Sequence, residues 1–127
     1  MITIAENTQY SLKIDIPKNR AFLKINGFWE NHEDIPAYLH DWDEAIRNLS
    51  RGFTVLTDAS TAVIHPEDVI LIHSEAQDKI GNAGVRKVAE LLALDRSVGE
   101  SDTILAGNGM TKKSFYNRLE ALRWLDQ

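Results

Sequence analysis

Apolar and polar residues alternate along two neighbouring stretches near the beginning of the sequence. Every second residue is apolar in Tyr10–Ile16, and the same spacing recurs in Ala21–Gly27. A period of two is typical of a β-strand that buries one face. The short segment between them, residues 17–20, consists of proline and polar residues, which favour turns. The pattern therefore predicts an antiparallel β-hairpin.

Two further stretches show the spacing of amphipathic helices. After the hairpin, apolar residues recur at intervals of four and three, which places them on one face of a helix. A second helix is predicted to begin near Pro66 and to end at Gly81, because proline suits a first turn and glycine a C-terminus. The apolar stripes are Ile35, Leu39, Trp42, Ile46 and Leu49 in the first helix, and Val69, Ile72, Ala76 and Ile80 in the second.

The segments between and after these helices predict strands. Phe53–Thr57 is a short apolar and β-branched run, typical of a strand buried on both faces. Val85–Leu94 is rich in residues that favour helices. We nevertheless expect a parallel strand there, because strand and helix alternate up to this point. Residues 102–106 are expected to form a short helix, and Lys112–Phe115 a brief edge strand.

The order of these elements indicates an α/β fold. A last helix is expected to follow Asn117, which has the spacing of a capping box with Glu120. We expect a small mixed β-sheet, with an antiparallel first pair followed by parallel strands, and with helices packed on it. No repeat, low-complexity stretch or linker divides the sequence, so residues 1–127 are expected to form one domain.

The composition argues against several classes of protein. The 127 residues include 14 basic and 19 acidic side chains, a formal net charge of −5, which disfavours a nucleic-acid partner bound through phosphates. The absence of cysteine excludes disulfides, thiolate metal sites and thiol catalysis. The sequence has no apolar run of about 18 residues and no signal-peptide pattern at its start. We therefore expect a cytoplasmic protein without a membrane span.

The stretch Asp58–Thr61 is the position best suited to chemistry. It follows the predicted strand Phe53–Thr57, and sites in open α/β sheets form outside the carboxyl ends of strands. Ser60 or Thr61 could accept a phosphoryl group there, with Asp58 beside them. The simpler interpretation is a turn, in which the hydroxyls and the carboxylate bind loop amides. Both interpretations place these residues in a loop.

Motifs for metal binding or catalysis are absent. The four histidines form two pairs spaced by eight residues, too far apart along a helix to share one ion. Phosphate-loop and nucleophile-elbow patterns are missing. A small enzyme using Asp58, Ser60 and His65 would require these side chains to converge within hydrogen-bond reach. We expect no cofactor, no metal and no catalytic residue, and favour a protein that is not an enzyme.

Acidic residues are concentrated around the first predicted helix. Residues 30–44 carry six acidic and no basic side chains. Such a run is either a solvated helix face or a docking surface for a basic partner. Basic residues near the C-terminus offer the opposite charge, so electrostatics would permit a homodimer. They are Lys112, Lys113, Arg118 and Arg123.

Taken in order, the chain resembles the SpoIIAA-like group of STAS-related domains. The helix start at His65–Val69 is similar to the "P-E-D" start of these proteins, and Gly84–Ala89 is similar to their "G-v-r-k-v-A" strand. The segment Phe115–Leu125 looks like their closing "F…E-A-l-x-W-L" helix. The resemblance runs from end to end, and it implies a small mixed sheet covered by helices.

The resemblance also implies a class of function. In regulatory STAS proteins a partner kinase phosphorylates a serine at the start of the helix after the central strand. A non-enzymatic signalling or protein-interaction module is therefore implied, with Asp58, Ser60 and Thr61 at the switch. The corresponding stretch here, 58–66, lacks the Asp-Ser-Ser-Gly-like motif of those proteins.

A second function follows from the similarity of this group to lipid-binding CRAL-TRIO domains. That similarity implies a small apolar or lipid ligand as the alternative to a protein partner. Such a ligand would require a cavity between the sheet and the helices. The residues expected to line it are Trp42, Ile46 and Leu122.

Overall fold

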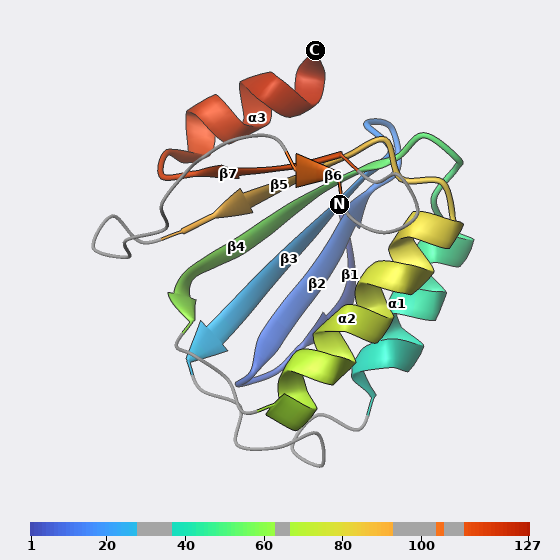
Figure 1. Ribbon diagram of the computed structural model, residues 1–127. Coiled ribbons are helices and arrows are strands. Elements are labelled where there is room, and N and C mark those ends of the chain that lie inside the picture. The colour runs from blue at the N-terminus through green and yellow to red at the C-terminus, as the bar shows by residue number, and fades with distance from the viewer. Residues whose placement is uncertain (28–36, 63–66, 93–103, 106–110) are drawn as a thin grey trace.

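The computed structural model describes residues 1–27, 37–62, 67–92, 104–105 and 111–127. Within these residues, seven strands form one mixed sheet in the order β1-β2-β3-β4-β5-β7-β6, and three helices pack on it (Figure 1). The strands are β1 (Ile2–Glu6), β2 (Tyr10–Asp15), β3 (Arg20–Gly27), β4 (Thr54–Ala62), β5 (Lys87–Leu91), β6 (Ile104–Leu105) and β7 (Thr111–Phe115). The helices are α1 (Tyr38–Arg47), α2 (Glu67–Asn82) and α3 (Arg118–Asp126).

The strands pair in the mixed arrangement that the sequence predicts. β1, β2 and β3 pair antiparallel in turn, whereas β3, β4, β5 and β7 run parallel to one another. β6 pairs antiparallel with β7. β4 therefore lies in the interior of the sheet, with β3 on one side and β5 on the other.

The helices cover the two faces of the sheet unequally. α1 and α2 lie side by side on one face, and α3 lies on the other (Figure 1). Adjacent residues of β4 show the same division, because Val55 belongs to the cluster beneath α1 and α2, whereas Leu56 belongs to the cluster beneath α3. The sheet is thus the middle layer of three.

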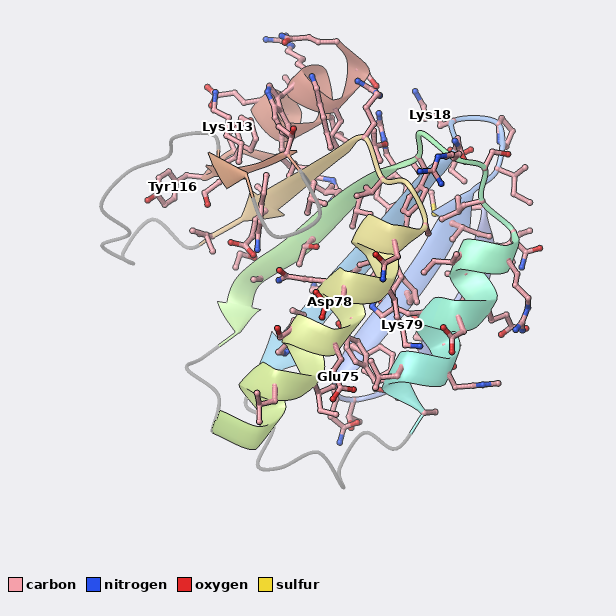
Figure 2. All side chains as sticks on the ribbon, turned by 45° about the vertical axis from the view of Figure 1, so that its right-hand side comes forward. Lys18, Glu75, Asp78, Lys79, Lys113 and Tyr116 are labelled. Atoms are coloured by element: carbon pink, nitrogen blue, oxygen red, sulfur yellow. The ribbon has the colours of Figure 1, made fainter. Side chains whose placement is uncertain are left out.

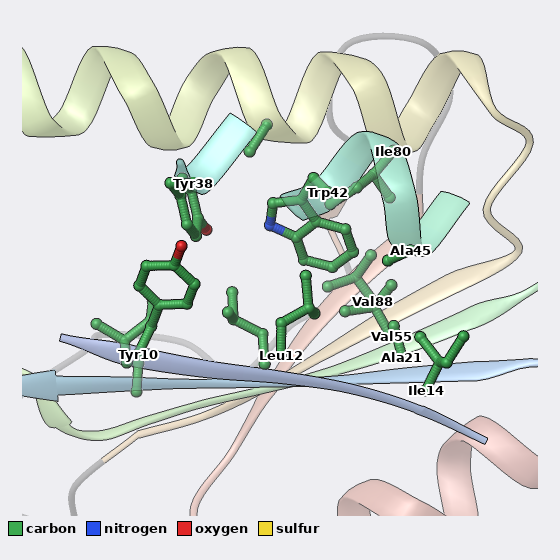
Figure 3. Close-up of a cluster of buried hydrophobic side chains, with 14 of the residues drawn as sticks. Tyr10, Leu12, Ile14, Ala21, Tyr38, Trp42, Ala45, Val55, Ile80 and Val88 are labelled. Atoms are coloured by element: carbon green, nitrogen blue, oxygen red, sulfur yellow. The ribbon is translucent and has the colours of Figure 1, made fainter. Parts of the chain in front are cut away.

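The larger hydrophobic cluster fills the space between the sheet and the pair of helices α1 and α2 (Figure 3). Tyr10, Leu12 and Ile14 of β2 all point into it, which explains their period of two in the sequence. Trp42 of α1 is fully buried among them. Burying a large apolar side chain stabilises a fold by about 1.5–3 kcal/mol, so this cluster contributes much of the stability of the α1–α2 side.

Helix α3 is fixed at both ends. At its start, the Asn117 side chain accepts a hydrogen bond from the Glu120 amide at 3.1 Å, as the capping spacing predicts. At its end, Arg86 donates to two of the last three carbonyl oxygens at 2.7 and 2.8 Å, and Lys87 donates to the carbonyl of Trp124 at 2.9 Å. Cations placed there satisfy the unpaired carbonyls and complement the helix dipole.

The segment Val85–Leu94 contains β5, as the predicted alternation of strand and helix requires, although its composition favours a helix. Val88 packs beneath α1 and α2, and Ala89 packs beneath α3. Burial on both faces, together with pairing to β4 and β7, outweighs the helix propensity of the side chains.

Three predictions about strands require correction. Residues 104–105 form β6 rather than part of a helix, because they pair with β7 and gain the hydrogen bonds of a sheet edge. β7 is consequently flanked by β5 and β6 and is not an edge strand. The strand predicted to end at Thr57 continues as β4 to Ala62, so Asp58–Thr61 is not a loop. Asp58 and Ser60 are half-buried on either side of the buried Ala59.

The sequence pattern also gave no indication of β1. This edge strand shifts register between Thr3 and Ala5, so its side chains do not alternate cleanly between buried and exposed. A regular period of two is therefore missing from its sequence.

Candidate functional site

An irregularity in β4 lies at the position that the sequence singles out. Lys24 of β3 pairs with Asp58, but Asn26 pairs with Thr61, so two steps along β3 correspond to three steps along β4. β4 therefore holds one extra residue between Asp58 and Thr61. Such bulges are frequent beside functional sites, where they redirect side chains.

The bulge is stabilised by the side chain of Asp58. Its Oδ1 accepts a hydrogen bond from the Ser60 amide at 3.0 Å and a second from the Ser60 Oγ at 2.6 Å. Pairing between β4 and β5 ends at the Asp58–Leu91 pair, so the carboxylate supplies an acceptor where this ladder stops. Both Asp58 and Ser60 are half-buried.

The structure thus brings Asp58 and Ser60 together, on a strand rather than in a loop. Thr61 continues the same strand, and its backbone pairs with Asn26. His65, which a catalytic arrangement with Asp58 and Ser60 would require, lies outside the described residues. Of the candidate residues, the structure therefore shows Asp58 and Ser60 in direct contact.

A pocket of about 240 Å³ lies beside this bulge, on the face of the sheet opposite α1 and α2. α3 packs against β4, β5 and β7 on this face. The pocket begins where that cover ends, and its lining comes from Met1, from β2, β3 and β4, and from the first residue of α3. It is therefore a depression at the border between a covered and an open part of the sheet.

The lining of the pocket follows two adjacent rows of the sheet. In one row, strand register aligns Lys13, Phe22 and Leu56. The neighbouring row consists of Ser11, Lys24 and Asp58. Neighbouring strands are about 4.8 Å apart, so each row places its side chains next to one another. Phe22 and Leu56 of the first row form an apolar floor, and the second row forms a polar side.

Arg118 closes the pocket from the side of α3. Its guanidinium carbon lies 6.0 Å from the centre of the Phe22 ring, within the range of a cation–π contact. Phe22 is half-buried and Leu56 is 1% exposed, whereas Arg118 and Lys24 are exposed. The pocket therefore combines a buried apolar floor with a charged rim.

Positive charge predominates around the pocket. The lining contains three cations, Lys13, Lys24 and Arg118, and one carboxylate, Asp58. Glu6 lies 3.8 Å from Lys13, but both side chains are substantially exposed, and an ion pair of this kind contributes little. This site could not be predicted from the sequence, because its residues come from strands and a helix that are far apart along the chain.

The residues expected to line an apolar cavity are not brought together. Trp42 and Ile46 of α1 pack on one face of the sheet, and Leu122 of α3 packs on the other. The sheet separates them, so the three cannot line one cavity. The expectation failed because similar apolar stripes on two helices do not reveal which face of the sheet each helix covers.

A second polar cluster connects the sheet with α1 and α2. The Tyr10 hydroxyl donates to Asp41 of α1, and the Tyr38 hydroxyl lies 3.5 Å from Nδ1 of His73 of α2. The two tyrosine rings meet edge to face with centres 5.0 Å apart (Figure 3). Burial raises the pKa of both Tyr10 and Tyr38, and the bond to Asp41 raises that of Tyr10 further. Both phenols are therefore protonated donors at neutral pH, which suits a structural role.

The acidic run around the first helix is partly engaged within the molecule. Asp41 accepts the bond from Tyr10, and Asp43 forms an ion pair with Lys79 of α2 at 3.0 Å. Glu44 is exposed, whereas the residues of the run before Ala37 lie outside the described residues. Two of the three described acids are thus engaged in contacts within the molecule.

The described part of the chain contains no cluster of three or more His, Cys, Asp or Glu side chains suited to hold a metal ion. None of its helices has both the length and the apolar character needed to cross a membrane.

Comparison with known proteins identifies the fold. No protein-family model and no curated protein matches the sequence. The structure is similar to the crystal structure of an uncharacterised protein of the DUF3478 family, with a SpoIIAA-like fold, from Shewanella loihica PV-4. The TM-score is 0.72 at 17% sequence identity, and the match covers 95% of this chain and 97% of the other. This similarity confirms the SpoIIAA-like fold that the resemblance implies.

Proposed function

We propose that the chain is a non-enzymatic interaction module of the STAS type, with Ser60 as its phosphoacceptor and Thr61 as the adjacent alternative. The observation that carries this proposal is the 2.6 Å hydrogen bond from Ser60 Oγ to Asp58 at the bulge of β4. The SpoIIAA-like fold supports it, since the fold is the one implied by the resemblance.

The contact between Ser60 and Asp58 suggests how modification would act. A phosphoryl group adds nearly two negative charges at neutral pH. Placed on Ser60 Oγ, it would replace the donated proton and bring negative charge next to the Asp58 carboxylate. Repulsion would then separate the two side chains and remove the acceptor of the Ser60 amide, which now holds the bulge. A partner that binds at the C-terminal end of β4 would encounter a different surface.

The test is affinity capture from the native host with phosphomimetic variants. We expect Ser60→Asp or Thr61→Asp to change the set of proteins retained, as measured by quantitative mass spectrometry. Ser74→Asp is the matched control, because Ser74 is exposed on α2, on the opposite side of the sheet. If all variants retain the same proteins as the unmodified chain, the switch is absent. Phosphoproteomics of the host would show directly whether either hydroxyl is modified.

The alternative, a carrier of a small apolar or lipid ligand, has less support. Trp42 is fully buried in the larger cluster, and Leu122 belongs to a separate cluster on the other face. Native mass spectrometry of freshly purified protein distinguishes the two functions, because a carrier would retain an apolar ligand.

A further inference from the structure

We infer that the pocket beside β4 is a binding site for a small organic carboxylate with a flat apolar body. The inference does not depend on phosphorylation of Ser60, because it rests on the lining of the pocket. It concerns the side chains of Lys13, Phe22, Lys24 and Arg118.

The charges around the pocket favour an anion. Lys13, Lys24 and Arg118 come from three different elements, and the fold brings them to the rim of one depression of about 240 Å³. Like charges held close together raise the free energy of the folded protein. Two carboxylates stand against these three cations, Asp58 in the lining and Glu6 at 3.8 Å from Lys13, which leaves a net charge of 3 − 2 = +1. A bound anion would therefore supply the negative charge that the rim lacks.

Arg118 indicates which anion fits. A guanidinium presents two parallel N–H groups, which match the two oxygens of a carboxylate. Arg118 is exposed, and its guanidinium carbon lies at the outer range of contact with the Phe22 ring, so the group can reorient towards a ligand.

The floor of the pocket indicates the body of the ligand. The Phe22 ring is half-buried and lies beside the buried Leu56 in the same row of the sheet. Because aromatic rings pair in offset or edge-to-face arrangements, the Phe22 ring favours a ligand with a flat aromatic body. The volume is slightly below the usual range for drug-sized ligands, about 300–1,000 Å³, which indicates a molecule the size of a single substituted ring.

The first experiment is an NMR titration of the isotopically labelled full chain, unphosphorylated and without a partner. The probes are benzoate, the neutral isostere benzamide, acetate and phenyl phosphate. We expect saturable shifts of the Phe22, Lys24 and Leu56 amides with benzoate, and weaker binding of the other three probes. Benzamide or acetate binding as tightly as benzoate, or phenyl phosphate binding more tightly, would overturn the assignment of the ligand class. Absence of saturable shifts with benzoate up to about 10 mM, which is tenfold above a weak dissociation constant of about 1 mM, would overturn the site itself.

The second experiment locates the site with variants. We expect Arg118→Gln and Lys24→Gln each to weaken benzoate binding about tenfold, because each removes a charge-assisted hydrogen bond. Arg123→Gln is the matched control, since Arg123 lies on the same helix, is exposed and does not line the pocket. Unchanged amide shifts outside the pocket would show that the variants fold. Equal affinity for all three variants would contradict the placement of the anion. Neither experiment involves Ser60, so a negative result would overturn the binding site without contradicting the proposed phosphorylation of Ser60.

Discussion

The Tyr10 hydroxyl joins β2 to α1 through its hydrogen bond to Asp41. The ring of Tyr10 is 1% exposed, and Asp41 is half-buried, so neither group is fully hydrated in the folded protein. Hydrogen bonds to charged groups typically stabilise proteins by about 1.5–3 kcal/mol. This one residue therefore contributes both packing and a polar link between two layers.

We expect Tyr10→Phe to lower the free energy of unfolding by about 1.5–3 kcal/mol, because Asp41 would lose its donor. Tyr116→Phe serves as the control, since Tyr116 is exposed and lies outside the buried cluster. Urea unfolding followed by circular dichroism measures both. A destabilisation no larger than that of the control would show that the bond to Asp41 contributes nothing.

Tyr10 also contributes to the way in which the stability of the fold changes at alkaline pH. The pKa values of Tyr10 and Tyr38 are raised in the folded protein, so their contribution to stability is present below the unfolded value of about 10 and declines as the pH rises above it. In Tyr10→Phe part of this decline should disappear. Unfolding curves between neutral and strongly alkaline pH provide the measurement.

Sequence reasoning placed Asp58 and Ser60 beside each other, as the structure does, but predicted the wrong backbone around them. Asp58 and Ser60 were expected in a loop because polar residues usually interrupt a buried strand. Here Asp58 lines the pocket on the incompletely covered side of the sheet, where a polar side chain is compatible with a strand. The pocket could not be predicted, because the neighbours of Phe22 depend on strand register between distant segments.

Helix α3 depends on charged residues that come from other elements. Arg20 of β3 is 4% exposed, and it donates to Asp126 at 2.8 Å and to Thr54 Oγ1 at 2.8 Å. Together with Arg86 and Lys87, it ties the last turn of α3 to the sheet. The docking of this helix is therefore sensitive to the charge of Asp126.

The hydrogen bond from Arg20 holds the pKa of Asp126 below its usual range. A depressed folded-state pKa stabilises the fold above the unfolded pKa, about 3.9, and this contribution is lost as the pH falls through the folded value. We expect Asp126→Asn to be less stable than the native chain at neutral pH and to approach it as the pH falls through the folded-state pKa of Asp126. Thermal unfolding across this range provides the measurement, with the exposed Asp78→Asn as control. A constant difference at every pH would contradict the role of the charge.

Most helices and strands could be predicted, because their burial is periodic. α1, α2 and the β2–β3 hairpin each show a buried stripe that matches the sequence pattern. β1 and β6 could not be predicted in the same way. One is an irregular edge strand and the other has two residues, so pairing with a neighbour rather than periodicity determines their structure.

Charge is distributed unevenly over the whole molecule. α1 carries three acidic side chains and one basic side chain, a net charge of 1 − 3 = −2. β7 and α3 together carry four basic and two acidic side chains, a net charge of 4 − 2 = +2. Lys113 of β7 lies across the sheet from Glu75 and Asp78 of α2 (Figure 2). Two copies could therefore attract each other when the acidic side of one copy faces the basic side of the other.

We expect this asymmetry to favour a homodimer at low ionic strength and to favour it less at about 0.5 M salt, where the Debye length falls below about 5 Å. Lys113→Glu should weaken the dimer further. Lys18→Glu changes the net charge equally, but Lys18 is exposed in the turn between β2 and β3 and serves as control. Sedimentation velocity measures the mass in each case. The same mass under all conditions would exclude electrostatic self-association.

The unequal cover of the sheet also has a kinetic consequence. β4 and β5 are buried between helices on both faces, whereas on the side of α3 the described residues leave much of β2 and β3 uncovered. Local opening is easiest where fewest apolar contacts must break. Amide protons should therefore exchange with solvent more slowly in β4 and β5 than in β1 and β2. The pocket lies at the boundary between these two regimes, where a ligand that bridges Phe22 and Arg118 would slow the exchange of the more labile half.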